Sequence, residues 1–434
     1  MSPLASYRRL FGLTGPAYVL IAFLARLPLA MSQLGALLLV AGATGSYGAG
    51  GATAGALAVA NAVGSPLAGA LTDRVGQRPV LLVQALSGAA ALAALVLLGQ
   101  TYSAGDPWWP LAAVAALAGL VTPQIGTMAR VRWRPISRVA GQEDRRTVDA
   151  AFSYEGAADE ASFVLGPALV GLVVALVDAG TELTAAAALL GTFGTWFALH
   201  PTAALVGRPA PGPAGPARLL GAGLAFLVAV QLCIGALFGS VQTGASVLAT
   251  AAGEPGLTGL LHALLGVGSV AAGLAVVVVP DTFGYESRLR AFTAVLAVLS
   301  LPLLAVHSLG ALAAVLLVLG LAVAPSMITT FTLAERITQP RRLGAAMTLL
   351  AAVTGLGYAL GSSLAGQLAD WGGHTPAFAV TVVATALALL LALTGAATLR
   401  QGHSCARRLA TAGGGCGIRT HGRSRVGRFQ GACT

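Results

Sequence analysis

The chain has 434 residues, of which 56% are hydrophobic and only 9% are charged. A soluble domain usually carries about 25% charged residues, so this composition excludes an ordinary soluble enzyme and indicates a membrane protein. All 25 basic residues are arginine. The absence of lysine excludes a Walker-type nucleotide loop, whose lysine holds the phosphates, and it excludes Schiff-base chemistry.

The formal net charge of +10 is concentrated near the C-terminus. Residues 1–399 carry a net charge of +3, whereas residues 400–434 carry +7. The basic pI therefore does not indicate a nucleic-acid-binding protein. The segment 401–434 has no apolar run, and we interpret it as a disordered basic tail of the kind produced when a reading frame runs on. An arm that binds anionic lipid head groups is the alternative.

Apolar runs divide the rest of the chain. A membrane-spanning helix needs about 20 apolar residues, and twelve runs are that long: 17–40, 50–71, 79–98, 108–128, 150–177, 183–206, 219–248, 257–280, 289–307, 309–333, 343–369 and 375–399. The sequence therefore predicts an all-α polytopic membrane protein. Its two six-helix bundles, residues 1–206 and 219–400, are joined by the Pro- and Gly-rich linker 207–218.

Arginines precede the first expected span and follow every even-numbered span. The other loops hold acids instead, namely Asp106, Asp178, Glu182, Glu254 and Asp370. Because cytoplasmic loops collect positive charge, we expect both termini to be cytoplasmic, in a bacterial plasma membrane. Arg130, Arg132 and Arg134 are expected in the loop after the fourth span.

The segment GALTDRVGQRPVLL, residues 69–82, joins the second and third expected spans. A glycine at its start lets helices approach closely, and a glycine in its middle permits a tight turn. Its acid can accept hydrogen bonds at a helix N-terminus. The segment resembles the signature loop of the major facilitator superfamily, G-x-L-a-D-r-x-G-r-k, at Gly69, Asp73, Arg74, Gly76 and Arg78.

This resemblance, together with the twelve-span layout, implies the major facilitator fold and transport by alternating access. In that family the loop latches the two halves in one conformation and releases them in the other. The five matching residues are therefore expected to gate; charges that merely set the topology are the alternative. The arginine motif of the family's fourth helix is expected to be missing, because Arg130 lies beyond the expected span.

Three carboxylates cluster at Glu155, Asp159 and Glu160. The apolar residues 163–177 alone are too few to cross a core of about 30 Å at 1.5 Å per residue. The fifth helix must therefore extend back through the acids. Carboxylates inside a membrane are costly unless paired, protonated or hydrated, so we predict proton coupling here. A structural ion pair, or a helix that starts in the interface, is the alternative.

The same helix continues with Gly166, Pro167 and Gly171. These residues resemble the G-x-x-x-G-P-x-x-G-G motif of proton-coupled exporters of the superfamily, although Ser162 and Val170 replace two glycines. Proline removes a backbone donor and can kink a helix. We therefore expect a hinge, with a simply packed proline helix as the alternative.

Arg26 is the single charged residue of the first expected span. It lies about 13 Å along the helix from Ala17, and Asp159 lies at a similar depth in the fifth span. We predict an ion pair of Arg26 with Asp159 or Glu160. An arginine that extends to the membrane surface is the alternative.

Other polar residues within spans are cavity candidates, with interhelical hydrogen bonds as the alternative: Gln33, Asn61, Gln124, Gln231, Gln242 and Tyr358. Hydrolase and metal-binding motifs are absent, so no enzyme, cofactor or metal is expected. The sequence predicts a monomeric transporter that exports a small amphipathic compound in exchange for protons. An uncoupled facilitator or importer, and a non-transporting membrane sensor, are the alternatives.

Overall fold

The computed structural model describes residues 3–45, 47–103, 106–141, 145–206, 221–254, 257–280 and 282–395. Within these ranges the regular structure is entirely helical. Twelve helical stretches are long and apolar enough to cross a membrane, as the sequence predicts. The expected linker 207–218 and the expected tail 401–434 lie outside the described residues.

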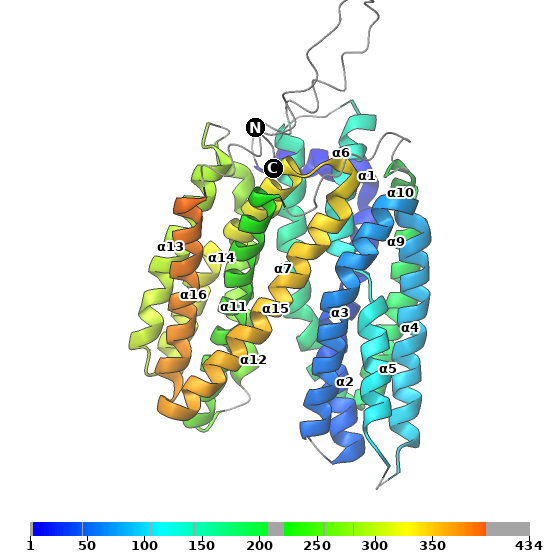
Figure 1. Ribbon diagram of the computed structural model, residues 1–434, viewed down its shortest axis with the longest axis vertical. Coiled ribbons are helices and arrows are strands. Elements are labelled where there is room, and N and C mark those ends of the chain that lie inside the picture. Colours follow the sequence, from blue (N-terminus) through cyan, green and yellow to red (C-terminus); the bar gives the residue numbers. More distant parts are fainter. Residues whose placement is uncertain are drawn as a thin grey trace, which may run out of the picture.

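Figure 1 shows the helices as two bundles that lie side by side. The first half contains α1 (Pro3–Leu24), α2 (Leu27–Thr44), α3 (Tyr47–Val75), α4 (Gln77–Thr101), α5 (Trp109–Val121), α6 (Ile125–Val139), α7 (Arg145–Leu176), α8 (Ala179–Leu189), α9 (Thr195–Leu199) and α10 (Thr202–Leu205). The second half contains α11 (Ala222–Ala251), α12 (Thr258–Ala275), α13 (Tyr285–Ser300), α14 (Leu309–Ile337), α15 (Leu343–Gly372) and α16 (His374–Thr394).

Prolines interrupt two of the spans. The first span breaks between α1 and α2, where Pro28 occupies the first turn of the new helix, a position that proline tolerates. The fourth span breaks between α5 and α6, where Thr122 is extended (φ −66°, ψ 123°) ahead of Pro123. A residue before proline avoids the helical conformation, so the helix stops and restarts within the membrane.

The expected limits of the fourth span are wrong. This candidate span covers Trp109–Val139, so Arg130, Arg132 and Arg134 lie in α6 and not in a loop. The expectation was based on where the apolar run ends. Hydrogen bonds hold the charged side chains within the protein: Arg132, for example, donates to Gln77 Oε1 at 2.8 Å and to the Phe197 carbonyl at 3.0 Å.

The position expected for Glu182 is also wrong. Asp178 caps α8 by accepting a hydrogen bond from the Thr181 N–H at 2.7 Å, which starts the helix before Glu182. Glu182 is fully buried and faces α2, since a Cβ at Gly35 would come within 2.0 Å of its Oε2. A helix cap sets this helix start, and the apolar run does not reveal it.

The predicted extension of the fifth helix back through its three acids is confirmed. α7 runs for 32 residues from Arg145 to Leu176 without interruption, and it includes all three acids of the fifth span. These acids therefore lie within the bundle.

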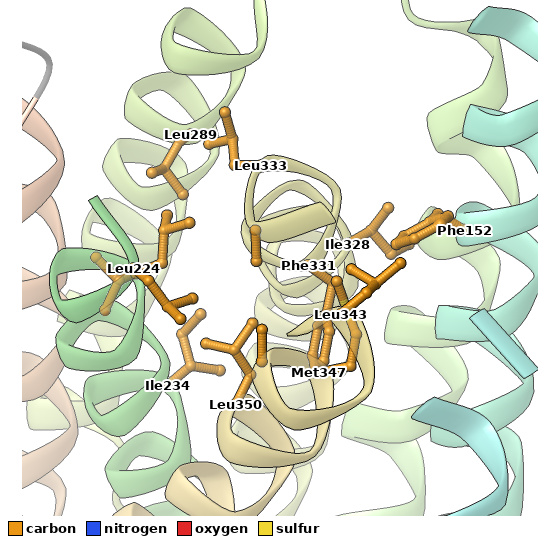
Figure 2. Close-up of a cluster of buried hydrophobic side chains, with 14 of the residues drawn as sticks. Phe152, Leu224, Ile234, Leu289, Ile328, Phe331, Leu333, Leu343, Met347 and Leu350 are labelled. Atoms are coloured by element: carbon orange, nitrogen blue, oxygen red, sulfur yellow. The ribbon is translucent and has the colours of Figure 1, made fainter. Parts of the chain in front are cut away.

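The two halves share a hydrophobic cluster, drawn in Figure 2. Phe152 of α7 packs there with Ile328 and Phe331 of α14 and with Leu343 of α15. Contacts of α3 with α15 and of α7 with α12 and α14 complete the seam between the halves. In Figure 1 the bundles converge at the end where α3 ends and α4 begins, and their ribbons diverge toward the opposite end. We call the converging end the arginine-rich end.

Candidate functional site

A buried charge cluster lies within the first half. Arg26, at the break between α1 and α2, forms an ion pair with Glu155, and its Nε lies 3.1 Å from Asp159 Oδ1. Arg130 Nη1 of α6 lies 2.6 Å from Asp159 Oδ2. The two arginine side chains are 3% exposed, Glu155 is 0% exposed and Asp159 is 24% exposed. Mutual pairing offsets the cost of burying these charges.

Neighbours from both halves hold this charge cluster. Trp133 Nε1 donates to Glu155 Oε1 at 2.5 Å, which fixes the carboxylate that Arg26 contacts. From the second half, the Phe331 ring lies 4.5 Å from the guanidinium carbon of Arg130. The charge cluster therefore lies at the seam between the halves.

Arg130 is the member of the charge cluster that sequence reasoning placed elsewhere. The signal that could have located it is the Thr122–Pro123 pair. Such a pair ends one helix before the membrane is crossed. A second helix must then complete the span, and it carries Arg130 within the membrane. The structure thus puts an arginine in the fourth span, contrary to the expected absence.

Glu160 lies apart from this charge cluster. It shares a helix face with Ala157 and Val164, which approach Gly273 and Gly266 of α12. Its side chain is buried beside Ser269. The predicted partner of Arg26 is therefore present as Asp159, and Glu155 joins it, whereas Glu160 faces the second half.

A second polar site ties the halves together at the arginine-rich end. Asp73, at the end of α3, accepts hydrogen bonds from the backbone N–H groups of Gly344 and Ala345, both at 2.8 Å. These donors belong to the first turn of α15, where N–H groups lack helical partners. We call this contact the Asp73 latch.

Glycines make the Asp73 latch possible. A Cβ at Gly69 would lie 2.1 Å from Thr348 Oγ1 and 2.6 Å from the Gly344 carbonyl oxygen. Gly76 has φ +90°, which lets α4 start directly after α3. Arg74 and Arg78 of the same segment are exposed.

Two further groups of side chains join the halves at this end. Arg134 of α6 pairs with Glu335 of α14 at 2.8 Å. Tyr285 of α13 donates to the carboxylate of Asp149 on α7, and Arg336 donates to the Tyr285 hydroxyl at 2.7 Å. These contacts and the Asp73 latch are polar, so they can break and re-form.

The expected hinge residues differ in their surroundings. Gly166 lies at a close approach to α2, since a Cβ there would come within 2.6 Å of Ala30 Cβ. Pro167 and Gly171 are exposed, and a Cβ at Gly171 would meet nothing within 4 Å. Close helix packing therefore explains why residue 166 is a glycine, but it does not explain the glycine at 171.

Most of the cavity candidates form interhelical hydrogen bonds. Asn61 of α3 donates to the carbonyls of Gly119 and Thr122 at 3.0 and 3.2 Å and accepts from Gln124 at 2.7 Å. It thereby satisfies polar groups that the break after α5 exposes. The others are placed as follows: Gln231 donates to Thr354 at 2.8 Å, Tyr358 donates to Gln242 at 2.9 Å, and Gln33 is exposed.

Comparison with known proteins gives the fold. Residues 227–404 match the model of the Major Facilitator Superfamily. The human organic anion transporter MFSD10 (TETRAN) aligns with a TM-score of 0.66 and 19% identity, over 86% of this chain and 98% of that one. The fold is that of the Major Facilitator Superfamily.

Other solved structures share the major facilitator fold. A bacterial homologue of the iron transporter ferroportin in an outward-facing state has a TM-score of 0.68 and 14% identity, over 87% of this chain and 97% of that one. The same type of protein with soaked iron aligns with a TM-score of 0.64 and 14% identity, over 86% and 98% of the chains. No curated protein sequence matches the chain.

The glycine contact beside the latch gives a first prediction. Gly69→Ala should weaken closure of the arginine-rich end, because the added methyl group would overlap Thr348 and Gly344. The chemical labelling of a cysteine introduced at this end should then become faster. Gly55→Ala on the same helix is the matched control, since a Cβ there would meet nothing within 4 Å. Equal labelling rates in the two variants would contradict the prediction.

Proposed function

We propose that this protein is a secondary transporter that moves a small solute across a membrane by alternating access. The observation that carries the proposal is the Asp73 latch, in which two half-structures are held by a few hydrogen bonds at one end. Rocking of two bundles about a central site is the usual mechanism of such folds.

The membrane orientation follows from charge. Loops rich in arginine are retained on the cytoplasmic side, so the arginine-rich end faces the cytoplasm in a bacterial plasma membrane. The latched conformation is then closed to the cytoplasm. The outward-facing state of the ferroportin homologue, which has the same fold, supports this assignment.

Proton coupling is the second part of the proposal. Glu160 is buried and Asp159 is partly buried. Both lie at the seam between the halves, where movement of one half against the other changes their surroundings. An ionisable residue inside a membrane usually takes part in an ion or proton path. The resemblance of Gly166 and Pro167 to an exporter motif favours export of an amphipathic compound in exchange for protons.

Uptake, or passage without protons, is the second candidate. It is favoured by the pairing of Asp159 with both Arg26 and Arg130. The carboxylate then serves as a structural partner of the two arginines and not as a proton carrier.

Vesicles with a trapped pH dye test the coupling. The full-length protein is reconstituted, and a panel of amphipathic cations, sugars and organic acids is added under an imposed proton gradient. Compound-dependent proton movement should appear and should fall at least about tenfold in Glu160→Gln or Asp159→Asn. Glu254→Gln, which removes an exposed acid at the opposite end, should leave it unchanged. Full transport with Glu155, Asp159 and Glu160 all neutralised would reject proton coupling.

A further inference from the structure

The break in the fourth span places a helix N-terminus inside the bundle. α5 ends at Val121 and α6 begins at Ile125. The N–H groups of a first helical turn lack partners and carry partial positive charge. Asp159 Oδ1 lies against this turn, since a Cβ at Gly126 would come within 2.1 Å of it. In membrane transporters such half-helix ends point at anionic groups.

Two buried arginines face the same carboxylate. Arg26 Nε and Arg130 Nη1 lie 3.1 and 2.6 Å from the two oxygens of Asp159. Arg26 Nη1 and Arg130 Nε are buried and have no hydrogen-bond partner among the residues that the structure describes. Each guanidinium has five donors, so the pair can hold more acceptor oxygens than Asp159 supplies.

Asp159 is the accessible member of the charge cluster. Its side chain is 24% exposed, whereas that of Glu155 is 0% exposed and is also held by Trp133. Phe331 from the second half packs on Arg130. Movement between the halves therefore changes access to the Asp159 carboxylate and its two arginines.

We infer that Arg26, Arg130 and the N-terminus of α6 form an anion-binding site, in which the Asp159 carboxylate takes the position of the cargo's anionic group. The cargo is then a small organic anion with a carboxylate or phosphate group, which guanidinium pairs recognise well. This inference rests on the proposed transport function and adds its substrate class. An arriving anion displaces Asp159 from the arginines.

Charge balance then determines how the anion and a proton move. The titratable groups around Asp159 are the two arginines together with Tyr154, Glu155 and Glu160. A monovalent anion on the arginines adds one negative charge to this charge cluster, which is costly unless a proton joins it. The anion and the proton therefore cross in the same direction, so the anion site supports uptake, the second candidate above, and not exchange for protons.

A chemical-rescue experiment tests the site on the full-length protein in lipid nanodiscs. Asp159→Ala removes the carboxylate that occupies the two arginines. Acetate and benzoate should then bind about tenfold more tightly than to the unchanged protein, because a competing charged partner is gone. Trp133, beside Glu155, reports binding by fluorescence once the other tryptophans are replaced by phenylalanine.

Matched controls isolate the arginine pair. Glu182→Ala removes another buried carboxylate of the first half, which lies between α8 and α2 and has no hydrogen-bond partner in the described part of the chain, and should leave acetate binding unchanged. Adding Arg130→Gln to Asp159→Ala should abolish the gain. If Asp159→Ala does not accumulate, Asp159→Ser replaces it and still leaves room for acetate.

Ligand charge decides the outcome. Benzylamine carries a positive charge on a ring like that of benzoate and should bind at least about tenfold more weakly than benzoate to Asp159→Ala. Equal or tighter binding of benzylamine, or no gain for either anion, would overturn the anion site.

Flux through vesicles separates this inference from the proposed function. Uptake of benzoate together with protons supports the anion site and transport, and it rejects exchange for protons. Acetate rescue without flux of any compound keeps the anion site and rejects transport. Flux of benzylamine without flux of benzoate keeps transport and rejects the anion site.

Discussion

Replacing Asp73 by asparagine should shift the protein toward a conformation open at the arginine-rich end. The carboxylate accepts two backbone hydrogen bonds from α15, and a charged acceptor makes each one stronger than a neutral pair. An amide has one acceptor oxygen, so one bond is lost and the other is weakened. The expected loss is about 2–4 kcal/mol, which changes the closed-to-open ratio by about 30-fold or more.

Distances between spin labels measure this shift. Labels at Val75→Cys and Gln339→Cys, with the native cysteines replaced by serine, lie on opposite halves at the arginine-rich end. The distance distribution should lengthen in Asp73→Asn. Arg74→Gln changes the adjacent exposed residue and should have little effect. Equal lengthening in both variants would show that loop charge, and not the two hydrogen bonds, holds the halves together.

Replacing Arg26 by methionine should destabilise the protein strongly. Arg26 is 3% exposed and pairs with Glu155 and Asp159, so its removal leaves buried carboxylate charge without a partner. Breaking a buried pair in this way costs about 3–5 kcal/mol. The apparent melting temperature in detergent should therefore fall by about 10 °C.

Arg134→Met is the matched control for that prediction. Arg134 also pairs with a carboxylate, that of Glu335, which is 3% exposed, but the Arg134 side chain itself is 39% exposed. Water screens this guanidinium, so the melting temperature should fall by less than in Arg26→Met. Similar losses in the two variants would show that burial does not set the strength of these pairs.

Composition and periodicity were sufficient for the overall fold. Twelve apolar runs on a chain without lysine predict a polytopic helical protein, because each span must satisfy its own backbone hydrogen bonds within lipid. The extension of α7 through Glu155, Asp159 and Glu160 follows from the same length argument, since 15 apolar residues cannot cross the membrane.

Contacts between distant segments could not be derived in the same way. The sequence predicted that Asp73 would accept hydrogen bonds at a helix end, but it did not identify Gly344 and Ala345 as donors. Those residues meet Asp73 only because the two halves converge at that end. Span limits also failed at Arg130, whose charge is compensated by Asp159, and at Glu182, which the Asp178 cap places inside α8.

The sequence by itself determined the number of membrane spans, the two-bundle layout and the residue types available for gating and coupling, because these depend on local composition and helix length. Tertiary structure decided which charges are paired, because an ion pair needs side chains from separate helices to meet. Arg130 belongs to the charge cluster for this reason. The break at Pro123 starts α6 as a new helix within the span. Arg130 of this helix therefore meets Asp159 of α7, and the first turn of α6 lies against the same carboxylate.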